Sequence, residues 1–546
     1  MARDAHTPPA RSLDELRWRS DLRDALPGDD GPHDPTPRPV VAAGWVEARP
    51  EPVAAPRLVG WSGEVADLLG LDVQALHEPD VVAALAGNHL PAGAAPFAAA
   101  YGGHQFGTWA GQLGDGRAIS LGEVSDAQGK IQQLQLKGAG PTAFSRTADG
   151  RAVLRSSLRE FLCSEAMHHL GIPTTRALSL VTTGQDVVRD VLYDGNPAPE
   201  PGAICCRVAP SFLRIGSLEL PAARGDERLL RATLALAMRH AGHDVAADDA
   251  ADAAGEWFRD LCIETAELVA AWMRVGFVHG VLNTDNVSLL GLTIDYGPYG
   301  WLEPWDPDWT PNTTDADRRR YRFGMQPTVM QWNLLQCARA LSLVVEDTAA
   351  LERGLAAYAE RYRSSFRRQQ AERLGWGSWR SDGRDLALVD ELEAILARSE
   401  VDHVLLHRRL SRIPTAPEAL EELAGSDLVG LLDEAIYDPA QLRASGAGDA
   451  LADWIREWAA RARDSGIDEQ ERRGRMDALN PLYVPRNYLA QEAIDAAEGG
   501  DTGLLHELHD TLRHPYDEQP GRERFARKRP EWARTKVGCS MLSCSS

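Results

Sequence analysis

The sequence predicts an α+β fold with two lobes, a small β-rich N-terminal lobe followed by a large, mainly helical one. Strand-like runs crowd the region 117–208, whereas helical periodicity dominates from residue 229 onward. We expect four parts: an irregular lead-in over 1–57, the small lobe over 58–225, the helical lobe with a C-terminal helical extension over 226–515, and a basic tail over 516–546.

The composition is that of a globular protein with an acidic surface. The 546 residues are 44% hydrophobic and 25% charged, as in soluble globular proteins. The formal net charge of -22 argues against nucleic-acid and anionic-membrane partners, because both require basic surface. No window approaches the roughly 18 apolar residues of a membrane span. The N-terminus lacks a secretory signal, and the odd number of cysteines suits a reducing compartment, so we expect a cytoplasmic protein.

The small lobe begins with chain breakers and short helical patterns. A Pro/Gly/Asp cluster over 27–32 favours an irregular lead-in, and two short helical patterns follow within 62–87. The next stretch, 101–114, is rich in glycine and aromatic residues. Its glycine density suggests backbone packed closely against another part of the protein.

Strands and one helix follow in an order that predicts a small sheet. The runs 117–123 and 131–137 are separated by turn-forming residues and predict a β-hairpin, whose second strand ends at Lys137. A helix is expected over 152–170, with its apolar residues on one side. Two further strand-like runs after this helix complete the sheet.

Helical patterns dominate the second lobe, and no period of 20 to 50 residues repeats, which argues against a solenoid. The clearest helical patterns cover 231–240, 257–276, 385–398, 416–437 and 449–463.

One loop carries the strongest chemical signal. His279 and Asn286 are spaced as in the kinase pattern H-x-D-x-x-x-x-N, and Asp295-Tyr-Gly follows in the place of D-F-G. In kinases the Asn and the second Asp hold a metal, and both are oxygen ligands of the kind that Mg²⁺ or Mn²⁺ takes. The usual catalytic Asp is replaced here by Val281. A plain surface turn is the alternative for Asn-Thr-Asp-Asn, but the combined spacing favours a metal site.

Asp285 directly precedes Asn286 and is the nearest carboxylate able to replace the missing base. As a general base it accepts the hydroxyl proton of the attacking group. The alternative is a carboxylate that merely stabilises a turn. The residues leave three functions open: nucleotidyl transfer, phosphoryl transfer with a displaced base, and a non-catalytic nucleotide-binding scaffold.

Lys137 is a candidate for neutralising phosphate charge, with a glutamate on the following helix as its partner. Periodicity places Glu165 among the apolar residues of that helix and Glu160 to the side, and therefore favours Glu165 facing inward. Either glutamate can instead form a surface ion pair worth under about 1 kcal/mol.

Glycines and arginines near the strand ends are candidates for contacting phosphate. A glycine-rich run before the hairpin lets backbone N–H groups approach phosphate, and arginine binds two phosphate oxygens at once. The alternatives are a plain turn and solvent-facing arginines. The candidates are Gly114, Gly116, Arg117, Arg207 and Arg214.

Together these motifs resemble the SelO family, also called the YdiU family. The resemblance runs from about residue 56 to the C-terminus. The matching text includes Tyr101-Gly-Gly-His-Gln-Phe-Gly, Leu136-Lys-Gly-Ala-Gly-Pro, Asp149-Gly-Arg-Ala-Val-Leu-Arg, His279-Gly-Val-Leu-Asn-Thr-Asp-Asn and Leu292-Thr-Ile-Asp-Tyr-Gly-Pro-Tyr-Gly. The resemblance implies a protein-kinase-like two-lobed fold that transfers AMP from ATP to Ser, Thr or Tyr hydroxyls of proteins and releases pyrophosphate. It also implies Mg²⁺ or Mn²⁺ as cofactor and ATP bound in the reverse direction to that in kinases.

The resemblance also implies roles for individual residues. Asp285 matches the proton acceptor, Asn286 and Asp295 match the metal ligands, and Glu160 matches the partner of Lys137. The nucleotide-binding positions that it implies are Gly114, Gly116, Arg117, Lys137, Asp149, Gly150, Arg207 and Arg214.

The C-terminus resembles that of the family, in which animal members place selenocysteine third from the end. Cys544 takes that position here, but Cys539 is separated from it by more than the usual two residues. Pro311 stands where bacterial relatives are expected to carry a cysteine.

Overall fold

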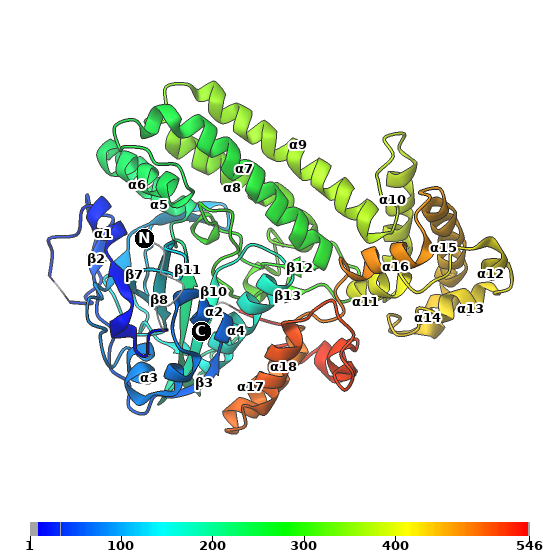
Figure 1. Ribbon diagram of the computed structural model, residues 1–546, viewed down its shortest axis with the longest axis horizontal. Helices are drawn as coiled ribbons and strands as arrows, with labels where there is room; N and C mark the ends of the chain where they lie inside the picture. Colours follow the sequence, from blue (N-terminus) through cyan, green and yellow to red (C-terminus); the bar gives the residue numbers. More distant parts are fainter. Residues whose placement is uncertain (1–8, 33, 544–546) are drawn as a thin grey trace.

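The computed structural model describes residues 9–32 and 34–543. It contains both helices and an antiparallel sheet: the sheet lies at one end of the molecule, and helices cover it and extend away from it (Figure 1). Among the described residues, no helix has the length and apolar character needed to cross a membrane.

Within residues 9–32 and 34–543, the main sheet is antiparallel and has nine strands, seven of them in the order β2-β4-β7-β8-β11-β10-β3. Of the other two, β1 pairs with β7 and β9 pairs with β11. These strands are β1 (Arg17–Arg19), β2 (Trp45–Glu47), β3 (Arg57–Trp61), β4 (Phe97–Ala99), β7 (Ala118–Ser125), β8 (Ile131–Lys137), β9 (Ala152–Val153), β10 (Arg176–Arg189) and β11 (Ala198–Ala209). Two small two-stranded sheets consist of β5 (Gly102–Gln105) with β6 (Thr108–Gln112), and of β12 (Phe277–Val278) with β13 (Gly300–Trp301).

The expected β-hairpin is confirmed as β7 and β8. Ala118 lies opposite Lys137 in the antiparallel register. The turn is closed by Asp126, whose Oδ1 accepts hydrogen bonds from the backbone N–H groups of Gln128 and Lys130. The hairpin therefore holds Lys137 at the end of a strand inside the sheet.

Residues 9–57, expected to be irregular, contribute short regular segments to the sheet. The strand β1 pairs with β7, and β2 pairs with β4. Each of these strands has only three residues, too few for a sequence period to be visible.

The helices follow the predicted pattern in most places. They are α1 (Asp21–Ala25), α2 (Gly63–Leu69), α3 (Pro79–Leu85), α4 (Leu154–His169), α5 (Ile215–Arg224), α6 (Glu227–His240), α7 (Ala250–Val275), α8 (Gln326–Leu341), α9 (Thr348–Arg373), α10 (Arg384–Leu396), α11 (His403–Leu410), α12 (Pro417–Glu421), α13 (Gly425–Gly430), α14 (Pro439–Ala444), α15 (Ala447–Arg463), α16 (Glu469–Asp477), α17 (Asn487–Glu498) and α18 (Gly503–Leu512).

The helical pattern over 416–437 is wrong as a single helix, since the structure has α12 and α13 there. Ala424, the residue before α13, has an extended backbone, and Gly425 begins the second helix. Glycine weakens a helix interior by about 1 kcal/mol relative to alanine, which favours a break at this point.

Separate hydrophobic clusters hold the sheet and the helices together. Leu158 and Phe161 of α4 pack with Leu489 of α17 and Leu505 of α18, so the last helices cover α4. The long helices α7 and α9 pack side by side, and α10 to α16 form a group at the far end (Figure 1). The sheet and α4 form one wall of the cavity that is described in the next subsection.

Candidate active site

A cavity of about 790 Å³ lies between the sheet, α4 and the loops of residues 281–298. Although the chain is strongly acidic, the cavity wall carries more cationic than acidic side chains. The cationic residues are Arg117, Lys137, Arg146, Arg151, Arg155, Arg159, Arg189 and Arg207. The acidic residues are Asp115, Asp149, Glu160, Asp285 and Asp295. Such a wall suits a polyanionic ligand.

Lys137 pairs with Glu160 across the cavity wall. The Nζ of Lys137 lies 2.8 Å from Oε2 of Glu160, and the other carboxylate oxygen lies 3.1 Å from Arg207. Burial lowers the pKa of Lys137, and the charge of Glu160 opposes that shift. Glu165 is buried too, as the helical periodicity predicts, but it pairs with Arg176 at 2.7 Å. The geometry thus joins Lys137 to Glu160, the partner that the family resemblance implies.

Asp295 is surrounded by three cations. Its carboxylate lies 3.7 Å from Lys137 and 2.5 Å from Arg207, and it accepts a hydrogen bond from Arg214. Burial alone would raise the pKa of Asp295, but the nearby positive charges outweigh it and hold the pKa well below its usual range. Its φ of 55° is left-handed, a strained backbone for a residue other than glycine. Asp295 therefore stays ionised and is held in one orientation.

Asp285 lies in the opposite electrostatic situation. It belongs to the 3-10 turn η3 (Thr284–Asn286) and is only 7% exposed. Its Oδ2 accepts a hydrogen bond of 3.3 Å from Gln105, and its buried Oδ1 has no hydrogen-bond partner among the described residues. Burial raises the pKa of Asp285 to about 6. An oxygen without a partner and with a raised proton affinity is suited to accept a proton.

The glycine-rich stretch packs against Asp285, as its composition predicts. A Cβ at Gly103 would lie 2.8 Å from Oδ1 of Asp285, so only glycine lets β5 approach so closely. Gln105 of the same strand donates to Asp285. The small β5–β6 sheet therefore forms one side of the pocket around the carboxylate.

The loop around Asp285 contains Asn286, one of the two candidate metal ligands. Nδ2 of Asn286 donates to the carbonyl of Val281 at 2.9 Å, which leaves Oδ1 of Asn286 for a ligand. Nε2 of the buried His279 lies 3.0 Å from the carbonyl oxygen of Ile294, next to Asp295. Val281 presents an apolar side chain to the cavity. The loop and Asp295 are thus tied together, without an acid in the usual position of the base.

The four predicted glycine and aspartate positions lie on the cavity wall. A Cβ at Gly114 would lie 2.3 Å from the ring of Phe144, and one at Gly116 2.8 Å from the Phe144 carbonyl. Gly150 has φ +69° and packs on Gly140. Asp149, beside it, accepts hydrogen bonds from Arg189 at 2.8 Å through both oxygens. These contacts keep two loops of the wall close to the strands.

Arg117 and Arg207 line the cavity, whereas Arg214 lies behind Asp295 rather than on the wall. Arg214 donates to the backbone carbonyl of Asp285 at 2.7 Å and to the carboxylate of Asp295. Its guanidinium also lies 4.4 Å from the ring centroid of Tyr101. Arg214 therefore positions the two acidic residues relative to each other.

Residues that the sequence patterns did not single out support the loop. The hydroxyl of Tyr321 donates to Oδ1 of Asn283 at 2.6 Å and accepts from the backbone N–H of Phe106 at 2.9 Å. With Gln105, these residues come from segments far apart in the chain, so no periodic pattern marks them. The only available signal was the length of the Tyr101-Gly-Gly-His-Gln-Phe-Gly match.

The C-terminal segment closes part of the cavity. The backbone N–H of Leu542 donates to the carbonyl of Pro311 at 3.0 Å, and that of Thr313 donates to the carbonyl of Leu542 at 2.8 Å. Cys539 is buried, which raises its pKa to about 11. Cys544 lies outside the described residues. Backbone pairing therefore tethers the tail to the segment around Pro311.

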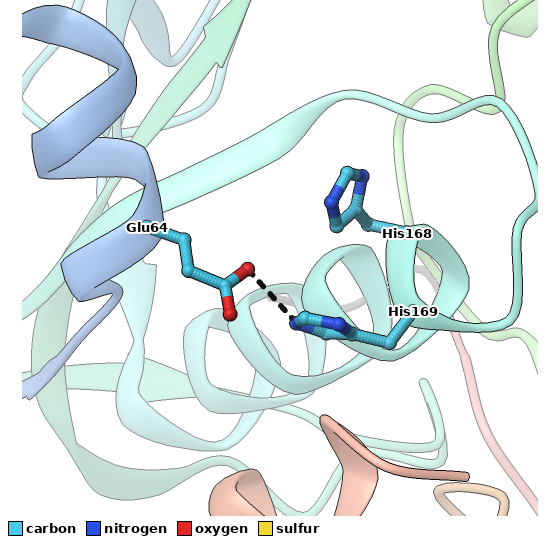
Figure 2. A group of neighbouring side chains, drawn as sticks. All are labelled: Glu64, His168 and His169. Carbon is cyan, nitrogen blue, oxygen red and sulfur yellow. Dashed lines mark ion pairs between the residues drawn. The ribbon is translucent and has the colours of Figure 1, made fainter. Parts of the chain in front are cut away.

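A second group with metal-binding side chains lies at the end of α4, apart from Asn286 and Asp295. One possible ligand atom from each of Glu64, His168 and His169 lies within 4.8 Å of the others (Figure 2). The carboxylate of Glu64 also pairs with Arg513 at 2.6 Å and lies 3.5 Å from Arg176. Glu64 also lies 3.3 Å from Nε2 of His169, so these side chains form an ion-pair network around one carboxylate (Figure 2).

The oxygen donors of the active site fit a hard divalent cation. Asp295 is ionised, Asn286 offers its Oδ1, and the adjacent Asp285 has a buried oxygen without a partner. Carboxylate and amide oxygens, completed by phosphate oxygens, are the usual ligands of Mg²⁺ and Mn²⁺.

Comparisons with known proteins assign the chain to one group. Residues 43–513 match the family model described as "Protein adenylyltransferase SelO". A "Protein nucleotidyltransferase YdiU" of Azoarcus sp. (strain BH72) is 54% identical over 95% of this chain and 98% of the relative. The protein of the same name from Xanthomonas campestris pv. campestris (strain B100) is 52% identical over 98% of this chain and 100% of the relative. One from Rhodopirellula baltica is 53% identical over 95% and 97%.

Proposed function

The chain belongs to the SelO family of protein adenylyltransferases, and from this premise we propose that its acceptors are Ser, Thr or Tyr hydroxyls and that Asp285 takes their proton. ATP is the substrate that an adenylyltransferase requires. The observation that carries the proposal is the buried, unpartnered Oδ1 of Asp285 beside two metal-ligand candidates in a cationic cavity.

In this mechanism the acceptor hydroxyl oxygen forms a bond to the α-phosphorus of ATP. The bond between the α-phosphorus and the oxygen bridging to the β-phosphorus breaks, and pyrophosphate leaves with that electron pair. The hydroxyl proton passes to Asp285. Val281 keeps any acid out of the position that a kinase uses for γ-phosphoryl transfer, so the displaced base suits attack at a different phosphorus.

Cations on the wall bind the nucleotide and stabilise its charge. Lys137, fixed by Glu160, and Arg207, fixed by Glu160 and Asp295, offer positive charge that does not need to reorganise during the reaction. We assign Asn286 and Asp295 as the residues that hold Mg²⁺ or Mn²⁺. The metal, when bound, neutralises phosphate charge and polarises the phosphorus–oxygen bonds.

We also propose a kinase-like two-lobed fold with the domain division 1–57, 58–225, 226–515 and 516–546. The supporting observations are the antiparallel sheet before residue 210, the ion pair of Lys137 with Glu160, and the helices that follow. The further cations Arg117 and Arg146 support ATP bound in the reverse direction, because they offer charge for a leaving pyrophosphate. The six described cysteines are free and buried, which supports a cytoplasmic location.

The test uses the full-length protein, Mg²⁺ or Mn²⁺, a protein acceptor and ATP labelled either at the α- or at the γ-phosphate. We expect label from the α-phosphate on the acceptor, and tandem mass spectrometry should place AMP on Ser, Thr or Tyr. Transfer of γ-label alone would refute the proposed chemistry, and AMP on Lys or Cys would refute the acceptor class.

A further inference from the structure

A second cavity lies away from the active site, between α9, α10, α11 and the segment before α8. Its volume is about 150 Å³. Aromatic and aliphatic side chains form most of its wall, among them Trp305, Phe323, Phe366, Leu392 and Leu396. A cavity of this size accommodates a molecule of about one benzene ring.

Among the described residues that line this cavity, Arg373 at the end of α9 is the one arginine or lysine. Arg373 is only 2% exposed, and no carboxylate lies within 4.0 Å of it in the described part of the chain. Its Nε has no hydrogen-bond partner among those residues, and its Nη2 contacts only Nε2 of His403 at 3.4 Å. Arg373 is therefore a buried cation with no carboxylate at ion-pair distance among the described residues.

Other buried arginines of the protein show what is missing at Arg373. Arg461 donates to both oxygens of Asp385 at 2.7 and 3.0 Å, and Arg486 donates to both oxygens of Asp402 at 2.7 and 2.9 Å. A buried charge is costly unless it is paired and hydrogen-bonded. Arg373 thus lacks the carboxylate partner that Arg461 and Arg486 have.

The titratable groups around the cavity do not supply that partner. His403 and His407 are buried, which lowers the pKa of each well below its usual value and keeps both neutral. Glu393 also lines the cavity, but its carboxylate lies beyond ion-pair distance from Arg373, and burial raises its pKa to about 7. Burial lowers the pKa of Arg373 to about 9. Because this pKa is still above 7, Arg373 is charged at neutral pH.

We propose that this cavity binds a small monocarboxylate with an apolar, preferably aromatic, body. The carboxylate pairs with the guanidinium of Arg373, which binds two oxygens at once, and the body packs against Trp305, Phe323 and Phe366. The apolar wall and the volume disfavour a larger, more strongly hydrated phosphate ester.

Benzoate is the probe for this proposal, and benzamide, its neutral isostere, is the control. We expect benzoate at matched ionic strength to raise the thermal unfolding temperature of the full-length protein and to give a saturable signal in titration calorimetry. Benzamide should do neither. Absence of benzoate binding in calorimetry, or an equal response to benzamide, would overturn the proposal.

Two arginine variants separate ligand binding from a structural role. Arg373→Met should abolish the benzoate response while the unfolding temperature without ligand stays equal or rises, because an unpaired buried charge is removed. The matched control Arg461→Met leaves Asp385 unpaired and should lower the unfolding temperature, but it should keep the benzoate response. A benzoate response that survives in Arg373→Met would refute the site.

A third variant keeps the test decisive if Arg373→Met does not fold. Glu393→Gln removes the one carboxylate that the described residues place on the cavity wall, so benzoate should bind more tightly than to the wild type. Weaker binding of benzoate to Glu393→Gln, or its loss, would contradict the proposal.

Discussion

Asp285 and Asp295 face the same cavity from neighbouring loops, yet their surroundings drive them to opposite protonation behaviour. Asp295 is surrounded by Lys137, Arg207 and Arg214, which hold its pKa well below the usual range. Asp285 has one weak hydrogen bond from Gln105 and a buried free oxygen, and burial raises its pKa to about 6. Two carboxylates of one site thereby acquire different tasks: one remains an anion, and the other is able to take a proton.

This difference shows that burial alone does not determine whether the pKa of a carboxylate is raised or lowered. Both side chains are largely removed from solvent, and both would have raised pKa values from burial alone. The deciding factor is the number of cations within ion-pair distance. The following variants test that contrast, in order of decreasing effect on AMP transfer.

Asp295→Ala should have the largest effect. It removes a proposed metal ligand and leaves Arg214 buried without its carboxylate, so we expect AMP transfer to fall to background. Removing one partner of a buried ion pair costs about 3–5 kcal/mol of stability. Denaturant unfolding measures the stability, and transfer of α-labelled AMP measures the activity. A stable Asp295→Ala protein with normal activity would contradict the difference described between Asp285 and Asp295.

Asp285→Asn should remove the activity but not the fold. Loss of a general base lowers the rate by about 10²- to 10⁴-fold, whereas the neutral amide removes a poorly compensated buried charge. We expect unchanged ATP affinity in calorimetry and an equal or higher unfolding temperature. If Asp285→Asn lost stability as Asp295→Ala does, the two carboxylates would not differ as described.

Glu160→Gln should have an intermediate effect on transfer. Lys137 and Arg207 lose a charged partner, and a hydrogen bond between charged groups is worth about 1.5–3 kcal/mol, so a decrease of roughly tenfold or more is expected. Glu165→Gln is the matched control on the same helix, because Glu165 pairs with Arg176. It should lower stability and leave kcat/KM near the wild-type value; equal losses of kcat/KM in the two variants would argue against a specific role for Glu160.

Glu123→Gln should leave AMP transfer unchanged, because Glu123 of β7 lies outside the cavity although burial raises its pKa to about 7. A raised folded-state pKa means that the protonated form stabilises the fold. This stability is fully present below the unfolded pKa near 4.5 and is lost as the pH rises towards 7. The glutamine variant should lack that loss and be more stable above pH 7 by about 3 kcal/mol. Unfolding at several pH values measures it, and an identical pH profile in the two proteins would contradict the shift.

Local sequence was sufficient for much of this architecture. The hairpin of β7 and β8 and the helix α4 follow from side-chain periods and turn residues, which act between near neighbours. The spacing of His279, Asn286 and Asp295 also predicts the loop that lines the cavity with Asp285 and Asn286, because this loop is a continuous segment. Side-chain periodicity did not reveal the break between α12 and α13, where glycine interrupts the helix. It also did not reveal three-residue strands such as β1.

Contacts between distant segments could be read only from the folded protein. The helical period of α4 favours only Glu165 facing inward, but the folded protein buries both Glu160 and Glu165. Glu165 pairs with Arg176, and Glu160 pairs with Lys137. The place of Arg214 behind Asp295 and the free oxygen of Asp285 depend on strands and loops that meet across the chain. The charged partners of a side chain come from segments that are distant in the sequence and meet only in the folded protein. A sequence period, in contrast, reports only which face of an element is buried.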